Sequence, residues 1–422
     1  MELSYTKKSI APLYPVDLGG YGYYLDRVTD QVQEDIFVHV LLLRHESQTV
    51  LIANFDLVGL SGYIVRRVKE QLQERMPGLV DQVMLFCTHT HTAPAVPPYV
   101  GCGVPDYGYQ DFVVHTAVEA ALEAARQTYP VTGLRHVEYE AQPVGYNRTG
   151  AQGAEDHHVY GTAFYAQGCA PYVILNYSCH PVTLGPVKLI SADYPYYVLQ
   201  ELAARGYQGM FLNGCNGDID PISNRDSWGS GSQAQMMAYG KQIVAGLEEA
   251  LGKAQPAPVS ALEPQNFCFS LPLQKIALRD LPALTARCKA AADGDRAMER
   301  AVAEWESRIR ERCLRGLASE HEQVEIQLVH LGGCTLLALQ GELYTELGMR
   351  LREKLAPARL LIGSNANASL RYIPSFDEAV SESYGGLLSC ISDGVLPVAA
   401  EAMDVYLQAI SDCFQGKGDS YG

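Results

Sequence analysis

Two histidine-bearing segments in the first half of the chain carry the side chains best suited to metal chemistry. Residues 88–94 read THTHTAP and follow an apolar run, which places His89 and His91 at the end of a predicted strand. Side chains alternate along a strand with period two, so this spacing predicts that both imidazoles project to the same side. Residues 178–181 read SCHP and put His180 after a second apolar run. Imidazole nitrogen is a favoured zinc ligand, so the pattern predicts one shared metal site, with a structural hydrogen bond as the alternative role of each ring.

Two later segments can add oxygen atoms to the same site. Residues 211–221 read FLNGCNGDIDP, in which the glycines permit close backbone approach. The side chains of Asn213 and Asp220 in this segment either cap the turn or bind a polar ligand. Residues 339–344 read LQGELY and place Glu342 where an apolar strand gives way to a helix. A carboxylate there either favours the helix N-terminus or supplies the oxygen ligand that a histidine-rich zinc site lacks.

Apolar runs and helical stretches alternate along the chain and must position these side chains. Runs rich in valine, leucine, isoleucine and phenylalanine predict buried strands at residues 37–43, 50–55, 83–87, 172–177, 209–212, 324–339 and 360–363. Apolar residues at three and four spacing predict helices over 64–76, 112–127, 196–204 and 234–251. Met298, Val302, Trp305 and Ile309 share one face of a further helix, which we expect to pack against the body. The alternation predicts an α/β fold in which helices cover the sheets.

The composition indicates a globular protein that binds a small molecule. A chain of 422 residues with 47% hydrophobic content can bury a large core. Its formal charge of −16 repels nucleic acid and anionic lipid surfaces, which disfavours both as partners. No run approaches the roughly 18 consecutive apolar residues of an integral membrane segment. The eleven cysteines form no Cys-x-x-Cys pair and no secretory signal follows Met1, so we expect a cytoplasmic protein, while its oligomeric state is not predicted.

In this order, the four motifs resemble the N-terminal catalytic domain of the neutral (alkaline, non-lysosomal) ceramidase family. The similarity begins at residues 10–22 and 55–60 and therefore covers most of the chain. It implies a layered sandwich of mixed β-sheets covered by helices. It also implies a single catalytic domain over residues 1–422, in which the proline-rich connector 252–264 joins a first half (1–251) that carries the histidine motifs to a second half (265–422).

The resemblance also assigns roles to individual residues. The zinc ligands that it implies are His89, His180, Glu342 and Tyr372, the last from the segment RYIP at 371–374. His91 would lie beside the bound water or substrate. The remaining family positions are a cleft arginine, a second cleft tyrosine and polar residues of the substrate site; they match Arg148, Tyr384, Asn147 and Asp193. From its place in the segment FLNGCNGDIDP, we expect Asn213 to bind substrate in the same cleft.

Two departures from the family pattern bear on the chemistry. Asp220 of the segment GDIDP stands where ceramidases carry a serine, which excludes a serine nucleophile at that position. We also expect neither the immunoglobulin-like C-terminal domain of the family nor its secretion signal in this protein. We therefore expect a short intracellular relative for which ceramide itself is not the favoured substrate.

The expected function is hydrolysis of an amide (N-acyl) bond by water that zinc activates. His91 or Asp220 would take and return the proton, Arg148 would orient the substrate or hold an oxyanion, and Tyr384 would assist by hydrogen bonding. Pairing with acidic residues is the alternative role of Arg148, and capping a turn is that of Asp220. An esterase, a hydrolase of carbohydrate derivatives and a non-catalytic metal-binding relative remain open as other functions, because a fold and a zinc site do not fix the substrate.

Overall fold

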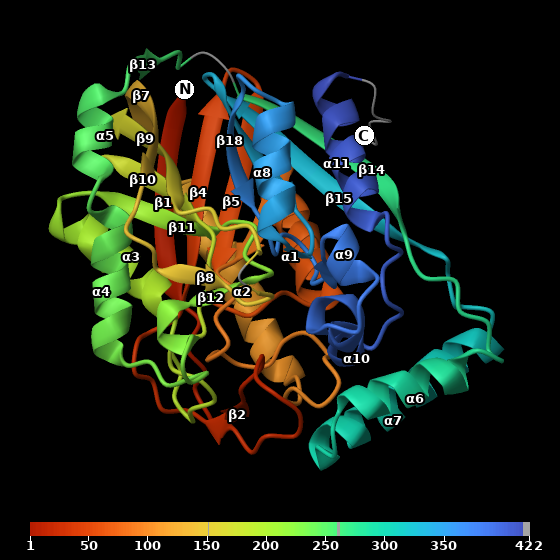
Figure 1. The fold of residues 1–422 in the computed structure, drawn as a ribbon. Helices are drawn as coiled ribbons and strands as arrows, with labels where there is room; N and C mark the ends of the chain where they lie inside the picture. Colours follow the sequence, from red (N-terminus) through yellow and green to blue (C-terminus); the bar gives the residue numbers. More distant parts are fainter. Residues whose placement is uncertain (151, 260–261, 417–422) are drawn as a thin grey trace.

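The computed structural model describes residues 1–150, 152–259 and 262–416, so the last six residues of the predicted second half lie outside the described range. Two β-sheets pack face to face and helices cover both outer faces, as Figure 1 shows. The α/β fold predicted from the sequence, a layered sandwich of mixed sheets, is therefore confirmed. Within the described ranges, no helix has the length and apolarity needed to cross a membrane.

The first sheet has nine strands among the described residues. Their order is β11 (Gln208–Asn213), β10 (Tyr172–Tyr177), β9 (His158–Ala166), β7 (Tyr129–Glu140), β1 (Glu2–Ser9), β4 (Phe37–His45), β5 (Gln48–Phe55) and β6 (Gln82–Cys87), with β13 (Pro256–Ala257) paired to β7. The pairs β5–β6 and β10–β11 are parallel and the others are antiparallel. The carboxyl ends of β5 and β6 emerge together, as do those of β10 and β11, and ligand sites of α/β proteins form at such ends.

The second sheet is smaller and packs on the first. It consists of β14 (Leu262–Pro272), β15 (His321–Leu331), β16 (Cys334–Leu339) and β18 (Arg359–Gly363). Leu41 and Ile52 of the first sheet share an apolar cluster with Leu336 and Leu361 of the second, while Val40 and Leu42 face the helices. Both faces of β4 are thus buried, which explains why its sequence is a continuous apolar run without alternation.

Helices cover the outer face of each sheet. On the first sheet lie α1 (Gly62–Arg75), α2 (Tyr107–Ala124), α3 (Tyr194–Ala204), α4 (Gln233–Val244) and α5 (Leu247–Lys253). The second sheet is covered by α8 (Thr345–Lys354) and α11 (Ala402–Phe414), whose Leu347 and Tyr406 join the same cluster as Ile362. A helical pair, α6 (Leu281–Ala291) and α7 (Arg296–Leu314), projects at the end of β14 and β15 (Figure 1). As expected, α7 buries Val302, Trp305 and Ile309.

Two sequence-based element predictions are wrong. The single strand predicted over 324–339 is a hairpin of β15 and β16, because Gly332 and Gly333 turn the chain with φ of +54° and +95°. The helix predicted over 234–251 is divided into α4 and α5. Gly246 lies at this break, where a Cβ would stand 2.5 Å from the ring of Tyr139.

Short strand pairs and helices shape the edge where the parallel strands end. The pairs are β2 (Val16–Asp17) with β3 (Val28–Thr29), β8 (Gly145–Asn147) with β12 (Ile219–Pro221), and β17 (Glu342–Leu343) with β19 (Tyr372–Ile373). The short helices are η1 (Ile222–Asn224), α9 (Phe376–Ala379), η2 (Tyr384–Leu388) and α10 (Ser389–Asp393). These elements and the loops between them supply the walls of the cavity described next.

Candidate metal centre and active-site cavity

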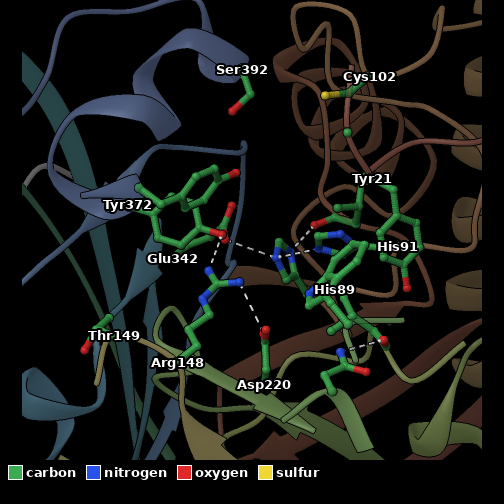
Figure 2. Close-up of a pocket in the computed structure, with 18 of the residues that line it drawn as sticks. Tyr21, His89, His91, Cys102, Arg148, Thr149, Asp220, Glu342, Tyr372 and Ser392 are labelled. Atoms are coloured by element: carbon green, nitrogen blue, oxygen red, sulfur yellow. Dashed lines mark hydrogen bonds and ion pairs between the residues drawn. The ribbon is translucent and has the colours of Figure 1, made fainter. Parts of the chain in front are cut away.

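Three imidazoles from two strand ends converge at this edge. The ligand nitrogens of His89, His91 and His180 all lie within 4.8 Å of one another, and among the described residues these form a group able to hold a metal ion. The Nε2 atoms of His89 and His91 are 3.2 Å apart. Figure 2 shows His89 and His91 side by side, with Glu342 and Tyr372 facing them. The structure therefore brings the predicted histidine residues together.

The two histidines of the THTHT segment meet for a reason other than strand alternation. Strand β6 ends at Cys87, and His89 adopts a left-handed backbone with φ of +70°. A non-glycine residue rarely adopts this conformation, and it persists only where surrounding contacts hold it. Here the His89 N–H donates to the Leu57 carbonyl oxygen at 3.0 Å. The turn at His89 directs both rings into the cavity. The two rings therefore lie on the same side, as predicted, but the predicted cause, strand alternation, is wrong.

The flanking threonines hold the turn that carries His91. Thr90 and Thr92 donate their hydroxyl protons to the Ser191 carbonyl oxygen at 2.8 and 2.9 Å. The Ser191 hydroxyl in turn donates to the buried carboxylate of Glu34 at 2.5 Å. These contacts explain why threonine occupies the positions on both sides of His91, because its hydroxyl joins this turn to the segment that precedes α3.

Hydrogen bonds to the backbone orient His89 and His180. The Nδ1 of His89 lies 2.6 Å from the Val58 carbonyl oxygen, and the Nδ1 of His180 lies 3.2 Å from that of Ile219. A carbonyl oxygen can only accept, so each Nδ1 carries the proton and each Nε2 presents a lone pair. This is the arrangement by which proteins orient metal-binding histidines.

Glu342 and Tyr372 come to the site as neighbours across one strand pair. Glu342 of β17 is in register with Tyr372 of β19 in a parallel pair. The Glu342 Oε2 lies 3.2 Å from the Nε2 of His89 and 3.4 Å from that of His180. The Tyr372 hydroxyl lies 3.4 Å from the Nε2 of His180. The four residues predicted as metal ligands therefore surround one point.

The spacing of these atoms fits a tetrahedral cation site. Ligands about 2.1 Å from a tetrahedral ion are about 3.4 Å apart, close to the separations between Glu342 Oε2 and both Nε2 atoms. The Oε2 of Glu342 is buried and has no hydrogen-bond partner among the described residues. An acceptor-only carboxylate oxygen that faces two lone pairs is unfavourable unless a cation or protons lie between them. The donor set thus fits a metal ion such as zinc.

Burial and charge set the protonation states around this point. Burial lowers the pKa of His91 well below its ordinary value, and the neighbouring His89 and His180 add to the shift. Burial and the positive charge of Arg148 lower the pKa of His180 as well. Burial alone would raise the pKa of Glu342, but a proton between its carboxylate and the rings of His89 and His180 outweighs burial and holds that pKa well below the ordinary value; a bound cation would take the place of that proton. Neutral imidazoles beside an ionised carboxylate are the forms that bind a metal.

Arg148 links the predicted ligands to Asp220. Its guanidinium lies 3.2 Å from the Asp220 Oδ1, and it donates to the Tyr372 hydroxyl at 3.1 Å and to the Gly217 carbonyl oxygen at 2.8 Å. Figure 2 shows Arg148 between Asp220 and the Glu342–Tyr372 pair. Tyr384 packs edge-on against Tyr372 with ring centroids 5.6 Å apart. These three predicted catalytic residues therefore lie on the same wall of the cavity.

Comparison with known proteins gives an independent indication of the fold. No protein-family model matches the sequence, and no curated protein matches it significantly. The solved neutral ceramidase from Pseudomonas aeruginosa aligns with a TM-score of 0.75 at 17% identity, over 97% of this chain and 73% of that one. The chain has the neutral ceramidase fold. A second structure, a ceramidase complexed with C2, aligns with a TM-score of 0.77 at 16% identity, over 100% of this chain and 76% of that one.

In this ceramidase fold, three residues predicted to bind substrate do not line the cavity. Asn147 donates to the Asp218 carboxylate at 2.7 Å and accepts from the Thr149 hydroxyl at 2.7 Å. Asp193 caps the N-terminus of α3 and accepts from the Thr183 hydroxyl at 2.6 Å. The polar atoms of both side chains are engaged by neighbouring loops. The prediction that they bind substrate is therefore wrong, and both residues instead hold the loops in position.

Asn213 is the third of these residues, and its amide lies between the two segments that carry the histidines. Its Nδ2 donates to the carbonyl oxygens of Thr88 and Cys179, both at 3.0 Å, and its Oδ1 accepts from the Cys179 N–H at 3.3 Å. Thr88 precedes His89, and Cys179 precedes His180. The Asn213 amide therefore joins the two backbone segments that carry the histidines, and it does not reach the cavity of the ceramidase fold.

Several cavity residues of this ceramidase fold were not predicted from the sequence. Gly20 lies against His91, where a Cβ would stand 2.7 Å from the ring, and Tyr21 packs edge-on to His91 with ring centroids 5.3 Å apart. Trp228 packs edge-on to Tyr21 at 5.1 Å and is half exposed. The segment GGYG at 19–22 carried a signal, since a glycine pair beside an aromatic residue permits close backbone approach. Trp228 lies in a loop whose sequence has no motif or hydrophobic periodicity that would predict a place in the cavity.

Proposed function

We propose that this protein is a zinc-dependent hydrolase that cleaves an amide (N-acyl) bond with water. The observation that carries the proposal is the convergence of two Nε2 lone pairs, the unpartnered Glu342 oxygen and the Tyr372 hydroxyl on one point. The ceramidases that share the fold supply the reaction class. A cytoplasmic location is part of the same proposal.

A zinc ion at this point would polarise the substrate carbonyl and lower the pKa of a water molecule to about 7. His91 is the favoured proton acceptor, because its lowered pKa keeps the ring neutral and its Nδ1 has no partner among the described residues. Asp220 is less suited to that role, since its Oδ1 is paired with Arg148 at 3.2 Å. His91 would return the proton to the leaving amine.

Arg148 would hold negative charge that develops on the carbonyl oxygen. Asp220 and the Gly217 carbonyl oxygen fix its guanidinium, and Asp220 raises its pKa well above the ordinary value although burial opposes that shift. A fixed cation in a shielded site stabilises an oxyanion without reorganisation during the reaction. The ring of Tyr384 lies 5.6 Å from the Arg148 guanidinium, and its hydroxyl would donate a further hydrogen bond.

Metal analysis tests the centre directly. We expect about one zinc per chain in the wild-type protein and loss of that zinc in His89→Ala and Glu342→Ala. His115→Ala serves as the matched control, because His115 is exposed on α2, and it should keep the metal. Zinc retained in both ligand variants would contradict the proposal.

Activity measurements on the same proteins separate the competing functions. Panels of N-acyl, ester and glycoside compounds would be assayed before chelation, after chelation and after zinc addition. We expect zinc-dependent hydrolysis of N-acyl compounds, and we expect His91→Gln to lose that activity but keep the metal. Preference for esters or glycosides would replace the amide proposal. Stoichiometric zinc without any hydrolysis would indicate a non-catalytic relative. Loss of zinc in His91→Gln would make His91 a ligand.

A further inference from the structure

The lining of the cavity is aromatic and polar, and branched aliphatic side chains are rare in it. The cavity encloses about 740 Å³, a size suited to a single small molecule. Its described lining includes seven tyrosines and Trp228, whereas Val58 and Val182 are the branched aliphatic residues. Hydrocarbon chains are best accommodated by aliphatic walls, while tyrosine and tryptophan combine ring faces with hydrogen-bonding groups. The lining therefore favours a substrate with rings and hydroxyl groups.

The charge of the lining disfavours an anionic substrate. Five carboxyl groups and two guanidinium groups face the cavity. Arg148 is engaged by Asp220 at 3.2 Å, and Arg225 packs over the ring of Tyr146 at 5.0 Å. Away from the proposed zinc, the lining carboxyl groups of Asp226 and Glu378 would repel a phosphate or carboxylate on the substrate. Hydroxyl or ammonium groups, which donate hydrogen bonds, suit these acids better.

One carboxyl group on the wall opposite Arg148 forms no hydrogen bond or ion pair with the part of the chain that the structure describes. Asp393 ends α10 and lines the cavity, and its Oδ2 is buried without a hydrogen bond among the described residues. Figure 2 shows the neighbouring Ser392, with Cys102, across the opening from Arg148 and Asp220. Burial raises the pKa of Asp393 well above its ordinary value, and the charge of Glu342 adds to this shift. An unpaired acid in such a place is costly unless a ligand hydroxyl satisfies it.

The same cavity has an exposed aromatic surface in its wall. Trp228 is 50% exposed and is held edge-on by the buried Tyr21, at 5.1 Å between ring centroids. Tyr21 also contacts His91, so the indole stands next to the reacting end of the cavity. A large indole held against a buried ring but open to solvent is suited to stack on a ring of the substrate.

We infer that the substrate is a compact, hydroxyl-rich N-acyl compound of the amino-sugar type, stacked on Trp228 and bound through a hydroxyl group by Asp393. A lipid with two hydrocarbon chains does not match this cavity. The inference rests on the proposed amide hydrolysis and names the substrate class for that reaction.

Steady-state kinetics of the zinc-loaded enzyme test the substrate class. N-acetylglucosamine and N-acetylsphingosine in detergent micelles would be compared, and we expect the larger kcat/KM for the amino sugar. We expect Asp393→Ala and Trp228→Ala to raise KM for N-acetylglucosamine about 10- to 100-fold with little change in kcat. Asp393→Asn and Trp228→Phe, which preserve shape, should lie between wild type and alanine. A larger kcat/KM for the lipid, or an unchanged KM in both alanine variants, would overturn the inference.

Tryptophan fluorescence separates failure of this inference from failure of the proposed function. The chain has two tryptophans, and Trp305 is fully buried, so a change on ligand addition reports Trp228. If no N-acyl compound is hydrolysed in a zinc-dependent manner, the proposed function fails. Quenching by N-acetylglucosamine in wild type but not in Trp228→Phe would still support this binding site. Absence of quenching in the wild-type protein would overturn it.

Discussion

The Asn213 amide offers a sharp test of how the fold positions the metal ligands. Asn213→Ala removes three hydrogen bonds, two to carbonyl oxygens and one from an N–H, at the backbone just before His89 and His180. At about 1 kcal/mol net for each bond, we expect the free energy of unfolding to fall by about 3 kcal/mol. Groups that orient metal ligands also affect affinity, so zinc should bind about 10- to 100-fold more weakly.

Asn176 provides a closely matched control on the neighbouring strand. Its Nδ2 donates to the carbonyl oxygens of Leu212 and Ile362 at 3.0 and 2.9 Å, and its Oδ1 accepts from the Ile362 N–H at 3.0 Å. Asn176 and Asn213 are both 1% exposed. Asn176→Ala should therefore cost similar stability, but it should leave zinc affinity unchanged because its contacts join the two sheets away from the histidines.

Chemical denaturation of the metal-free proteins and zinc competition with a chromogenic chelator measure the two quantities separately. The expected result is a similar loss of stability in both variants and a loss of zinc affinity in Asn213→Ala alone. Equal zinc affinities in the two variants, at either the wild-type or a weakened value, would refute the positioning role of Asn213.

Three further outcomes follow from the site. Gly20→Ala would place a Cβ 2.7 Å from the His91 ring at a residue with φ of +99°, so hydrolysis should fall at least about 10-fold with zinc content retained, and unchanged rates would contradict this. Thr92→Val removes a hydroxyl that donates to Ser191 at 2.9 Å, and a melting experiment should show about 1 kcal/mol less stability. Burial lowers the pKa of both His91 and His180 below 6.5, so the unfolded chain binds more protons below that pH and the stability of the metal-free protein should fall as pH drops. In pH-dependent denaturation, His91→Gln should reduce this slope by up to about 1.4 kcal/mol per pH unit, and an unchanged slope would be inconsistent with a buried neutral His91.

The convergence of the ligands could be predicted from the sequence because strand ends are recognisable. The run at 172–177 matches β10 at both bounds, and His180 follows it within three residues. Strand direction alone does not bring the two together, because β6 and β10 belong to different parallel pairs with antiparallel strands between them. Their ends meet through tertiary contacts such as those of Asn213 with Thr88 and Cys179. The left-handed turn at His89 could not be foreseen, because backbone contacts from Leu57 and Val58 stabilise it.

Other parts of the molecule carried weaker signals. The strands β1, β7, β9 and β14 were not predicted from the sequence. Of these, β7 and β14 are partly exposed and contain Pro130, Pro264 and Pro272, residues that disfavour a strand prediction. The role of Asn213 was ambiguous, because the same amide can cap a turn, bind a ligand or join two backbones. The cavity walls at Trp228 and Asp393 come from loops and a short helix, whose placement depends on tertiary contacts.

The ligand set has a consequence for how the molecule holds together. His89 and His180 belong to the part of the chain that forms the first sheet, and Glu342 and Tyr372 follow strands of the second. A cation bound by all four residues would cross-link the two sheets. The ligands from one sheet alone would then bind it with lower affinity. Metal occupancy would then depend on how the two sheets pack together. Chelation would remove the cofactor and also break a link between distant segments of the polypeptide.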